Sequence, residues 1–225
     1  MTKIQTFVLQ FDNGLTPEDI PKFRGAVISS LKQKNILYHN HLENKFRYAY
    51  PLIQYKRIHQ KAAIVCVGDG LKAIHELFAS DNFLFIIGGK EVEMKMDYAK
   101  IYDNDILISD KFQLYRIRNW LPLNSVNYAM FQNTDNLIGK IQILERVLIG
   151  NILSFLKGVG IHLEEQIELH ITDLSDQRPT TYKEMKLMAF DIEFKANLYL
   201  PQYIGIGKNA SVGYGTLTKV KNEKL

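Results

Sequence analysis

The sequence predicts an α+β protein with two tandem ferredoxin-like (RRM-like) domains, the second of which lacks a full second helix. Apolar patterns in the first half follow the order strand, helix, strand, strand, helix, strand, which is the ferredoxin-like arrangement. The chain has 225 residues, which is enough for a second domain. The second half repeats most of this order, but only four residues separate Leu200 from Gly205, too few for the last helix. We therefore expect domains at residues 1–92 and 93–225.

Apolar spacing and turn residues define the elements of the first domain. Residues 3–11 alternate as a strand with Phe7, Leu9 and Phe11 on one face. Thr16 and Pro17 are typical of a helix start, and the helix is expected to end near residue 34. The remaining elements are expected to be strands at residues 46–58, 61–67 and 83–87 and a short helix that begins at residue 69.

The second domain is predicted in the same way. Thr134 and Asp135 are expected to cap a long helix that ends at Gly158, with an inward apolar stripe. The members of this stripe are Leu137, Ile138, Ile141, Leu144, Leu148, Ile152 and Phe155. The strands are expected at residues 105–108 and 112–121, paired around residues 109–111, then at 166–172, at 184–200 with a bulge near Ala189, and at 216–220.

Composition and cysteine content exclude several classes of protein. Hydrophobic residues make up 46% and charged residues 23%, which is ordinary for a folded domain and argues against disorder. No apolar run reaches the length of a membrane span, and residues 1–6 do not resemble a signal peptide. The single cysteine, Cys66, excludes an internal disulfide and a multi-cysteine zinc site. We expect a cytoplasmic protein that does not bind membranes.

Positive charge is concentrated in two segments. Residues 22–61 contain nine Lys or Arg and one acid, and residues 195–225 contain five Lys and one acid. The stretch between them, residues 62–194, has a net charge of −6. If the two basic segments meet in space, they form a surface that attracts a polyanion such as a nucleic acid. The alternative is two separate solvated faces.

A glycine-rich run near the C-terminus is the first candidate site. It does not match the P-loop, and its match to the dinucleotide pattern at Gly205, Gly207 and Ala210 is accidental, because too little chain follows for a helix and a strand. We expect a loop whose backbone N–H groups approach a phosphate closely. The residues predicted to bind phosphate here are Gly205, Gly207, Lys208, Asn209, Ser211, Gly213 and Gly215. The alternative is a hairpin turn without a ligand.

A histidine pair, His39 and His41, is the second candidate site, and it lies in a polar loop of the first basic segment. Three interpretations remain open: a metal site, an acid–base pair, or two solvated side chains. A metal requires a third and usually a fourth ligand, and Glu43 is the only carboxylate nearby. The acid–base interpretation requires two groups that titrate near neutral pH, which histidine supplies.

Two stretches carry a resemblance to a known family. The stretch GIGKNASVGYGT at residues 205–216 resembles the C-terminal signature of the CRISPR-associated endoribonucleases that process precursor CRISPR RNA, within the RAMP superfamily. The His-Asn-His stretch at residues 39–41 and YAYPLIQYK at residues 48–56 are similar to the N-terminal part of one subgroup. The resemblance implies ferredoxin-like folds and metal-independent cleavage within each repeat, without a cofactor. The 2′-hydroxyl attacks the adjacent phosphate and leaves 2′,3′-cyclic phosphate and 5′-hydroxyl ends.

The resemblance also implies roles for individual residues. One of His39 and His41 takes the proton from the 2′-hydroxyl, and the other protonates the leaving 5′-oxygen. Lys32 stabilises the additional charge on the phosphate, and Tyr48, favoured over Tyr50, orients the phosphate or stacks on a base. Lys56 and Arg57 are predicted to join the glycine-rich loop in binding RNA.

The expected partner is CRISPR repeat RNA, and a homodimer and binding to subunits of a CRISPR effector complex are left open. One rival hypothesis is a non-catalytic RNA-binding subunit of such a complex, and a weaker one is a metal-dependent hydrolase that uses the histidine pair.

Overall fold

The computed structural model describes residues 2–31, 35–39, 41, 42, 45, 46, 49–79 and 83–220. The chain divides into two compact units. The N-terminal unit consists of residues 3–104 and the short segment Ser211–Gly213, and the C-terminal unit contains residues 105–210 and the chain from Tyr214 onward. The units therefore divide after Asn104, later than the expected boundary at residue 92.

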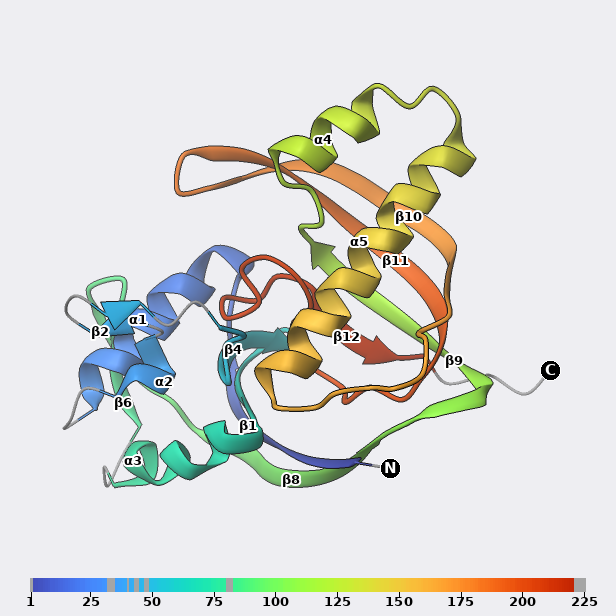
Figure 1. Ribbon diagram of the computed structural model, residues 1–225. Helices are drawn as coiled ribbons and strands as arrows, with labels where there is room; N and C mark the ends of the chain where they lie inside the picture. The colour runs from blue at the N-terminus through green and yellow to red at the C-terminus, as the bar shows by residue number, and fades with distance from the viewer. Residues whose placement is uncertain are drawn as a thin grey trace. The chain divides into compact units, whose positions relative to one another are not determined.

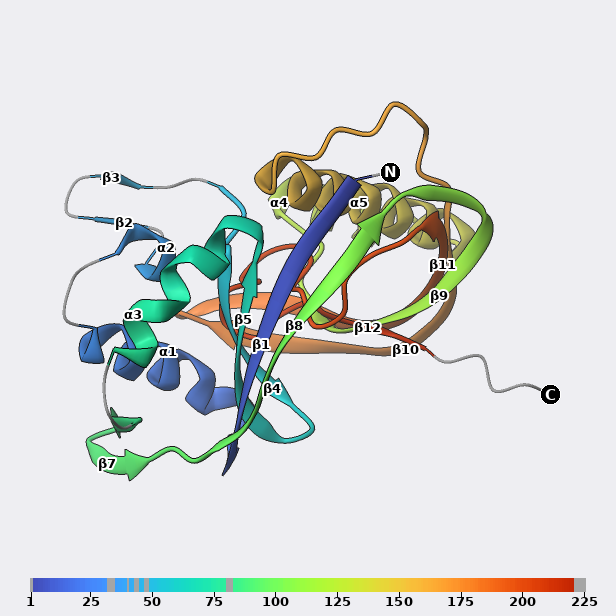
Figure 2. The ribbon, with the colours of Figure 1, turned by 90° about the horizontal axis from the view of Figure 1, so that it is seen from below.

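The N-terminal unit is built on a four-stranded sheet in the order β4-β5-β1-β8. Its strands are β1 (Thr2–Gly14), β4 (Ile53–Ile58), β5 (Lys61–Val67) and β8 (Met96–Ile106). The helices α1 (Ile20–Ser30) and α3 (Ile74–Phe78) lie on the same side of this sheet (Figure 2). The smaller elements are η1 (Pro17–Asp19), α2 (Ile36–His39), β2 (His41–Leu42), β3 (Lys45–Phe46), η2 (Gly68–Ala73), β6 (Leu84–Ile87) and β7 (Lys90–Glu93).

Aromatic side chains fill the space between this sheet and its helices. The ring of Phe11 on β1 packs edge-to-face against Phe23 of α1 and Phe85 of β6, with centroid distances of 6.0 and 6.4 Å. Phe7, on the same face of β1, packs against Phe78 of α3 at 6.3 Å. The alternation predicted for residues 3–11 therefore places its aromatic side chains on the face that the helices cover.

Two strand predictions in this half are wrong. Residues 83–87 do not complete the sheet, because β6 pairs with β7 in a separate hairpin and β8 takes the edge position beside β1. Most side chains of β8 are exposed, so its sequence lacks the apolar alternation that would mark a strand. The long strand predicted over residues 46–58 is also wrong, since β4 begins only at Ile53, after an irregular stretch that contains Pro51.

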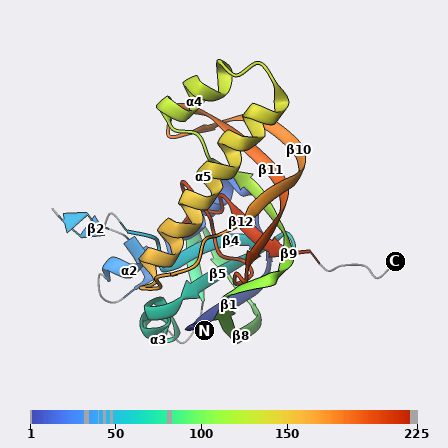
Figure 3. The ribbon, with the colours of Figure 1, turned by 45° about the vertical axis from the view of Figure 1, so that its right-hand side comes forward.

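The C-terminal unit contains a second four-stranded sheet, in the order β10-β11-β9-β12. Its elements are β9 (Ile108–Trp120), α4 (Ser125–Gln132), α5 (Leu137–Gly158), β10 (Leu169–Tyr182), β11 (Met185–Leu198) and β12 (Thr216–Lys219). The long helix α5 runs across one face of this sheet (Figure 1), and α4 lies on the same side (Figure 3). The strand pair predicted around residues 109–111 is wrong, because β9 runs through that stretch without a turn, and α4 was not predicted.

The helix α5 confirms the predicted stripe except in its first turn. Asn136 is the N-cap, with its side-chain Oδ1 accepting the Gly139 N–H at 2.7 Å, so the cap lies slightly later than predicted. Leu137 and Ile138 are exposed, and the buried side chains of the helix begin at Ile143. The buried members of the helix are Ile143, Leu144, Leu148, Ile152, Phe155 and Leu156.

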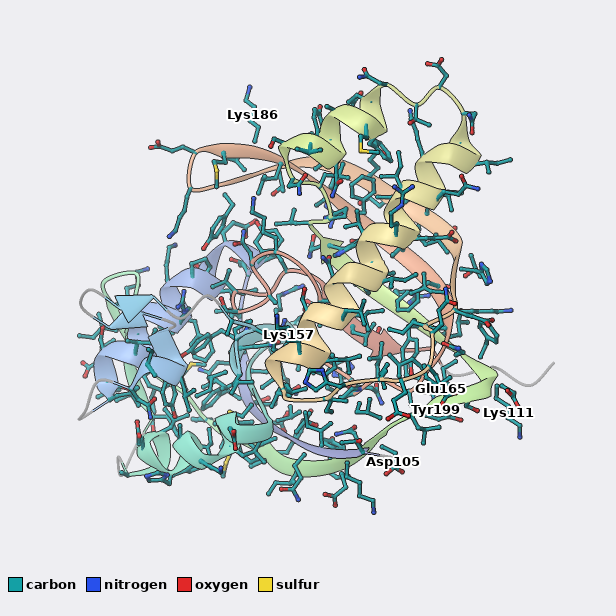
Figure 4. The ribbon with its side chains drawn as sticks, in the orientation of Figure 1. Asp105, Lys111, Lys157, Glu165, Lys186 and Tyr199 are labelled. Carbon is teal, nitrogen blue, oxygen red and sulfur yellow. The ribbon has the colours of Figure 1, made fainter. Side chains whose placement is uncertain are left out.

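The hairpin of β10 and β11 extends beyond the sheet as a two-stranded ribbon. The two strands pair as far as Tyr182 opposite Met185, whereas β11 pairs with β9 only from Phe190 onward. The turn residues Lys183 and Glu184 both have positive φ angles, as in a type I′ hairpin turn. Lys186 projects from this end of the ribbon (Figure 4). The register shift against β9 near Phe190 confirms the predicted bulge.

The two sheets share one topology. Counted along the chain within each sheet, the strands lie in the order second, third, first, fourth. This is the order of a ferredoxin-like sheet, and it confirms the predicted tandem α+β fold. Residues 199–215, all of them described, contain no helix before the last strand, as expected from their length. No helix in the described part of the chain is long and apolar enough to cross a bilayer.

Candidate functional site

The histidine pair lies on a short helix and the strand that follows it. The backbone places His39 as the last residue of α2 and His41 as the first residue of β2, which pairs with β3 through His41 opposite Phe46. Only the backbone of these two histidines is described. The predicted polar loop is therefore partly regular, with the pair flanking the junction between the two elements.

Two side chains tie α2 to the segment formed by η2 and α3. The buried Tyr38 donates its hydroxyl proton to the carbonyl oxygen of Ala73 at 2.9 Å. Asn35 donates its side-chain N–H to Glu76 Oε1 at 2.7 Å. Both contacts belong to residues that the sequence did not single out, since neither an isolated Tyr nor an isolated Asn carries a pattern.

The other predicted catalytic residues are placed less completely. Lys32 and Tyr48 lie outside the described residues. Tyr50 is half-buried, and its hydroxyl oxygen accepts a hydrogen bond from Gln54 Nε2 at 2.7 Å.

The glycine-rich run forms a loop whose two ends are joined by backbone hydrogen bonds. Gly205 forms a β-bridge with Thr216, and Ile206 N donates to the carbonyl oxygen of Gly215 at 2.8 Å. Gly215 N in turn donates to Asn119 O of β9 at 3.0 Å. These bonds fasten both ends of the loop to the C-terminal sheet.

The glycines of this loop are explained by protein contacts. Gly207, Gly213 and Gly215 all have φ angles between +61° and +91°, where residues with a Cβ are strained. A Cβ on Gly207 would lie 2.7 Å from Asn151 Oδ1, the acceptor of the buried Trp120 indole N–H. A Cβ on Gly215 would overlap the carbonyl oxygen of Ile206. The need for glycine at Gly207 and Gly215 therefore arises within the protein.

The tip of the loop, Ser211–Gly213, belongs to the N-terminal unit. The carbonyl oxygen of Ser211 accepts a hydrogen bond from the backbone N–H of Tyr55 on β4 at 2.9 Å, and Val212 forms a parallel bridge with Tyr55. A Cβ on Gly213 would lie 2.5 Å from Ile20 Cδ1, in the first turn of α1. The second basic segment thus contributes three residues to the unit that contains the first basic segment.

The polar residues of the loop differ in exposure. Lys208 is exposed, whereas Asn209 is half-buried with a positive φ angle of 58°. Tyr214 packs edge-to-face against Tyr182 at the end of the β10–β11 ribbon, with 5.8 Å between ring centroids. Lys208 is therefore the exposed cation of the predicted phosphate-binding set in this loop.

The two basic residues predicted on β4 lie in opposite environments. Arg57 is exposed, and its Nε–H donates to the carbonyl oxygen of Leu15 at 2.6 Å. Lys56 is fully buried, and burial lowers its pKa to about 7. A buried amine offers no exposed charge to a phosphate, so we leave Lys56 out of the RNA-binding residues proposed below. Alternate residues of a strand face opposite sides, and the charge run gave no sign of which side was covered.

Comparison with known proteins places this geometry in a family. A model of the Cas6b N-terminal domain matches residues 2–105, and a model of the Cas6b C-terminal domain matches residues 107–220. A protein from Methanocaldococcus jannaschii, the uncharacterised MJ0978, is 33% identical over 125 residues, which are 55% of this chain and 84% of that protein.

Solved structures agree with these matches. The crystal structure of a Cas6b superposes with a TM-score of 0.89 at 30% identity, covering 97% of this chain and all of that one. A second, of the CRISPR RNA processing endoribonuclease Cas6b, has a TM-score of 0.76 at 29% identity over the same shares. The type IV crRNA endonuclease Csf5, at 16% identity and a TM-score of 0.57, shares the fold. Since the two domain models together span nearly the whole chain, this protein belongs to the Cas6b family.

Proposed function

We propose that this protein is a metal-independent endoribonuclease that cuts CRISPR repeat RNA and so produces mature guide RNA. The observation that carries the proposal is the match of both Cas6b domains, since a relative that covers the whole fold is named a CRISPR RNA processing endoribonuclease. The His39–His41 pair at the junction of α2 and β2 supplies residues suited to the reaction.

The proposed reaction is a transesterification with two proton transfers. One histidine of the pair takes the proton of the 2′-hydroxyl, and the 2′-oxygen attacks the adjacent phosphorus. The bond from phosphorus to the 5′-oxygen breaks, and the other histidine protonates that oxygen. The products are a 2′,3′-cyclic phosphate and a 5′-hydroxyl. We propose the reaction without a metal because the pair can supply both proton transfers.

Lys32 and Tyr48 complete the proposed catalytic set. The Lys32 ammonium stabilises the charge that builds up on the phosphate oxygens, and Tyr48 orients the phosphate. For RNA binding we propose the glycine-rich loop together with Arg57. Support comes from the exposure of Lys208 and Arg57 and from the docking of Ser211–Gly213 on the strand that carries Arg57.

The first experiment tests the reaction itself. Repeat RNA is incubated with the protein in EDTA, beside a substrate with a single 2′-deoxy sugar immediately upstream of the cut. We expect the protein to cut the unmodified repeat RNA and to leave the deoxy substrate intact, because the deoxy sugar lacks the nucleophile. Cleavage of the deoxy substrate at the normal rate would contradict the mechanism, and loss of cleavage in EDTA that Mg²⁺ restores would favour a metal-dependent hydrolase.

Single substitutions of the histidines test the assignment of roles. Loss of a proton-transfer group should slow single-turnover cleavage at saturating protein by about 10²–10⁴-fold. RNA affinity should change little, since a neutral imidazole adds little attraction for phosphate. Should His39→Ala and His41→Ala both cut at the wild-type rate, the catalytic assignment fails. If the wild-type protein binds repeat RNA without cutting it, the protein is an RNA-binding subunit.

A further inference from the structure

The helix that ends at His39 is too short to be stable in isolation. It has four residues, Ile36–His39, whereas an isolated helix is marginal below about 12 residues because its first turn costs entropy that few hydrogen bonds offset. Its position must therefore come from contacts with the rest of the unit. Two side-chain hydrogen bonds from this part of the chain, made by Tyr38 and Asn35, reach the segment formed by η2 and α3.

The first contact is made by the residue immediately before His39. Tyr38 is 1% exposed, and its hydroxyl donates to the carbonyl oxygen of Ala73, at the last residue of η2, at 2.9 Å. Ala73 is itself the residue before α3. This hydrogen bond fixes the position of Tyr38 relative to the last residue of η2.

The second contact is made at the start of the same helix. The side chain of Asn35 uses both of its polar atoms: Oδ1 accepts the Leu37 N–H at 2.9 Å, and Nδ2 donates to Glu76 Oε1 at 2.7 Å. The Tyr38 N–H donates to the Asn35 carbonyl at 3.1 Å and closes the first turn. Asn35 therefore both starts α2 and ties that start to α3.

We propose that Tyr38 and the Asn35–Glu76 pair are positioning residues for the reaction, which hold the backbone of His39 and His41 in place. The inference rests on the proposed function, since it requires that the histidines transfer protons. Acid–base groups must be held close to the productive geometry, and a displacement of about 1 Å can cost about 100-fold in rate. Anchors at both ends of a four-residue helix supply that constraint.

Tyr38 does not itself transfer a proton in this arrangement. Burial raises the pKa of Tyr38 above its ordinary value of 10, so its hydroxyl remains a neutral donor. Its side chain is also closed to solvent and thus to substrate. The residue acts on the reaction only through the backbone that leads to the histidines.

The test compares two buried tyrosines. Tyr38→Phe keeps the ring and removes the hydrogen bond to Ala73. Tyr115→Phe is the control, because the Tyr115 hydroxyl is equally buried in the C-terminal unit, where it donates to the carbonyl oxygen of Leu198 at 3.2 Å and accepts the Leu200 N–H at 2.9 Å. We expect Tyr38→Phe to lower the saturating single-turnover rate between about 10- and 100-fold with an unchanged Kd for RNA. We expect Tyr115→Phe to cut at the wild-type rate even if its melting temperature falls by as much as that of Tyr38→Phe.

A second pair of variants keeps the inference testable if Tyr38→Phe does not fold. Glu76→Ala removes the acceptor for the Asn35 side chain, whereas Glu76→Gln retains an oxygen at Oε1. Glu76→Ala should be slow at saturation, and Glu76→Gln should recover most of the rate. Equal rates for the two variants would overturn the role of the pair.

The closing experiment separates this inference from the proposed function. His39→Ala, Tyr38→Phe and the double variant are compared at saturating protein. A slow His39→Ala, a slow Tyr38→Phe and a double variant whose loss is smaller than the product of the two single losses would support an action through the histidines. If His39→Ala is slow but Tyr38→Phe is not, the inference is wrong and the proposed function stands. If His39→Ala and His41→Ala both cut normally, the catalytic assignment fails, and the inference fails with it.

Discussion

Replacing Gly215 with Ala tests whether the glycine-rich loop owes its glycines to protein packing. The backbone of Gly215 has a φ angle of +61°, and a Cβ there would overlap the carbonyl oxygen of Ile206. The overlap cannot be relieved by a side-chain rotation, because both atoms are fixed by backbone. The two ends of the loop must therefore separate where Ile206 pairs with Gly215.

The cost follows from the contacts that open. A residue with a Cβ in the left-handed region costs about 1–2 kcal/mol. Separating the two ends of the loop weakens two backbone hydrogen bonds. Ile206 N donates to Gly215 O at 2.8 Å, and Gly215 N donates to Asn119 O at 3.0 Å. Each is worth about 0.5–1.5 kcal/mol net. We expect Gly215→Ala to lower the free energy of unfolding by about 2–5 kcal/mol.

Gly150→Ala is the matched control in the same unit. Gly150 lies within α5, and a Cβ there meets no atom within 4 Å. The substitution should stabilise the helix by about 0.5–1 kcal/mol. Urea unfolding can be followed by fluorescence of the single tryptophan, the buried Trp120. If Gly215→Ala is as stable as Gly150→Ala but binds RNA weakly, the packing explanation is refuted and close approach of RNA explains this glycine.

Two further predictions concern lysines. Lys56→Met should raise the free energy of unfolding by up to about 5 kcal/mol below pH 7, because the wild-type protein must bury a charged amine whose pKa falls from 10.5 to about 7. The gain should shrink as pH rises from 7 toward 10.5, since the wild type then folds with loss of a proton, and urea titrations showing no such trend would contradict the burial of Lys56. Lys208→Ala should weaken RNA binding and reduce the log–log salt slope by about 0.7 if the ammonium contacts one phosphate of a single strand. Lys111→Ala, which removes a charge elsewhere on the C-terminal unit (Figure 4), should leave that slope unchanged, and equal slopes for the two variants would remove Lys208 from the RNA-binding set.

The sequence predicted those elements whose apolar spacing reflects a packed face. β1 and β5 are buried along most of their length, and α5 buries a regular stripe, so their patterns were clear. The edge strand β8 is mostly exposed, and its pairing is invisible in its own composition. The hairpin of β6 and β7 was misread for a related reason: an apolar run predicts a strand but not its partner.

The sequence indicated which residue types could form the candidate site, but it did not indicate the burial or the hydrogen bonds of each side chain. A charge run cannot show that Lys56 is buried while Arg57, its neighbour on the same strand, is exposed. Tyr38 and Asn35 act through long-range hydrogen bonds to Ala73 and Glu76, and nothing local in the sequence marks such bonds. These hydrogen bonds can be identified only when the fold is known.

The glycine-rich loop also shows why a motif and its cause must be separated. Its sequence indicated backbone that approaches phosphate, yet Gly207 and Gly215 are required by contacts within the C-terminal unit, and Gly213 is favoured by its positive φ angle of 91°. Protein packing fixes the path of the loop, and along that path the exposed Lys208 is left free to meet a ligand. A glycine substitution in this loop should therefore affect RNA binding through folding, whereas a lysine substitution should affect it directly. Measuring stability and affinity on the same variants distinguishes the two causes, because only the first lowers both.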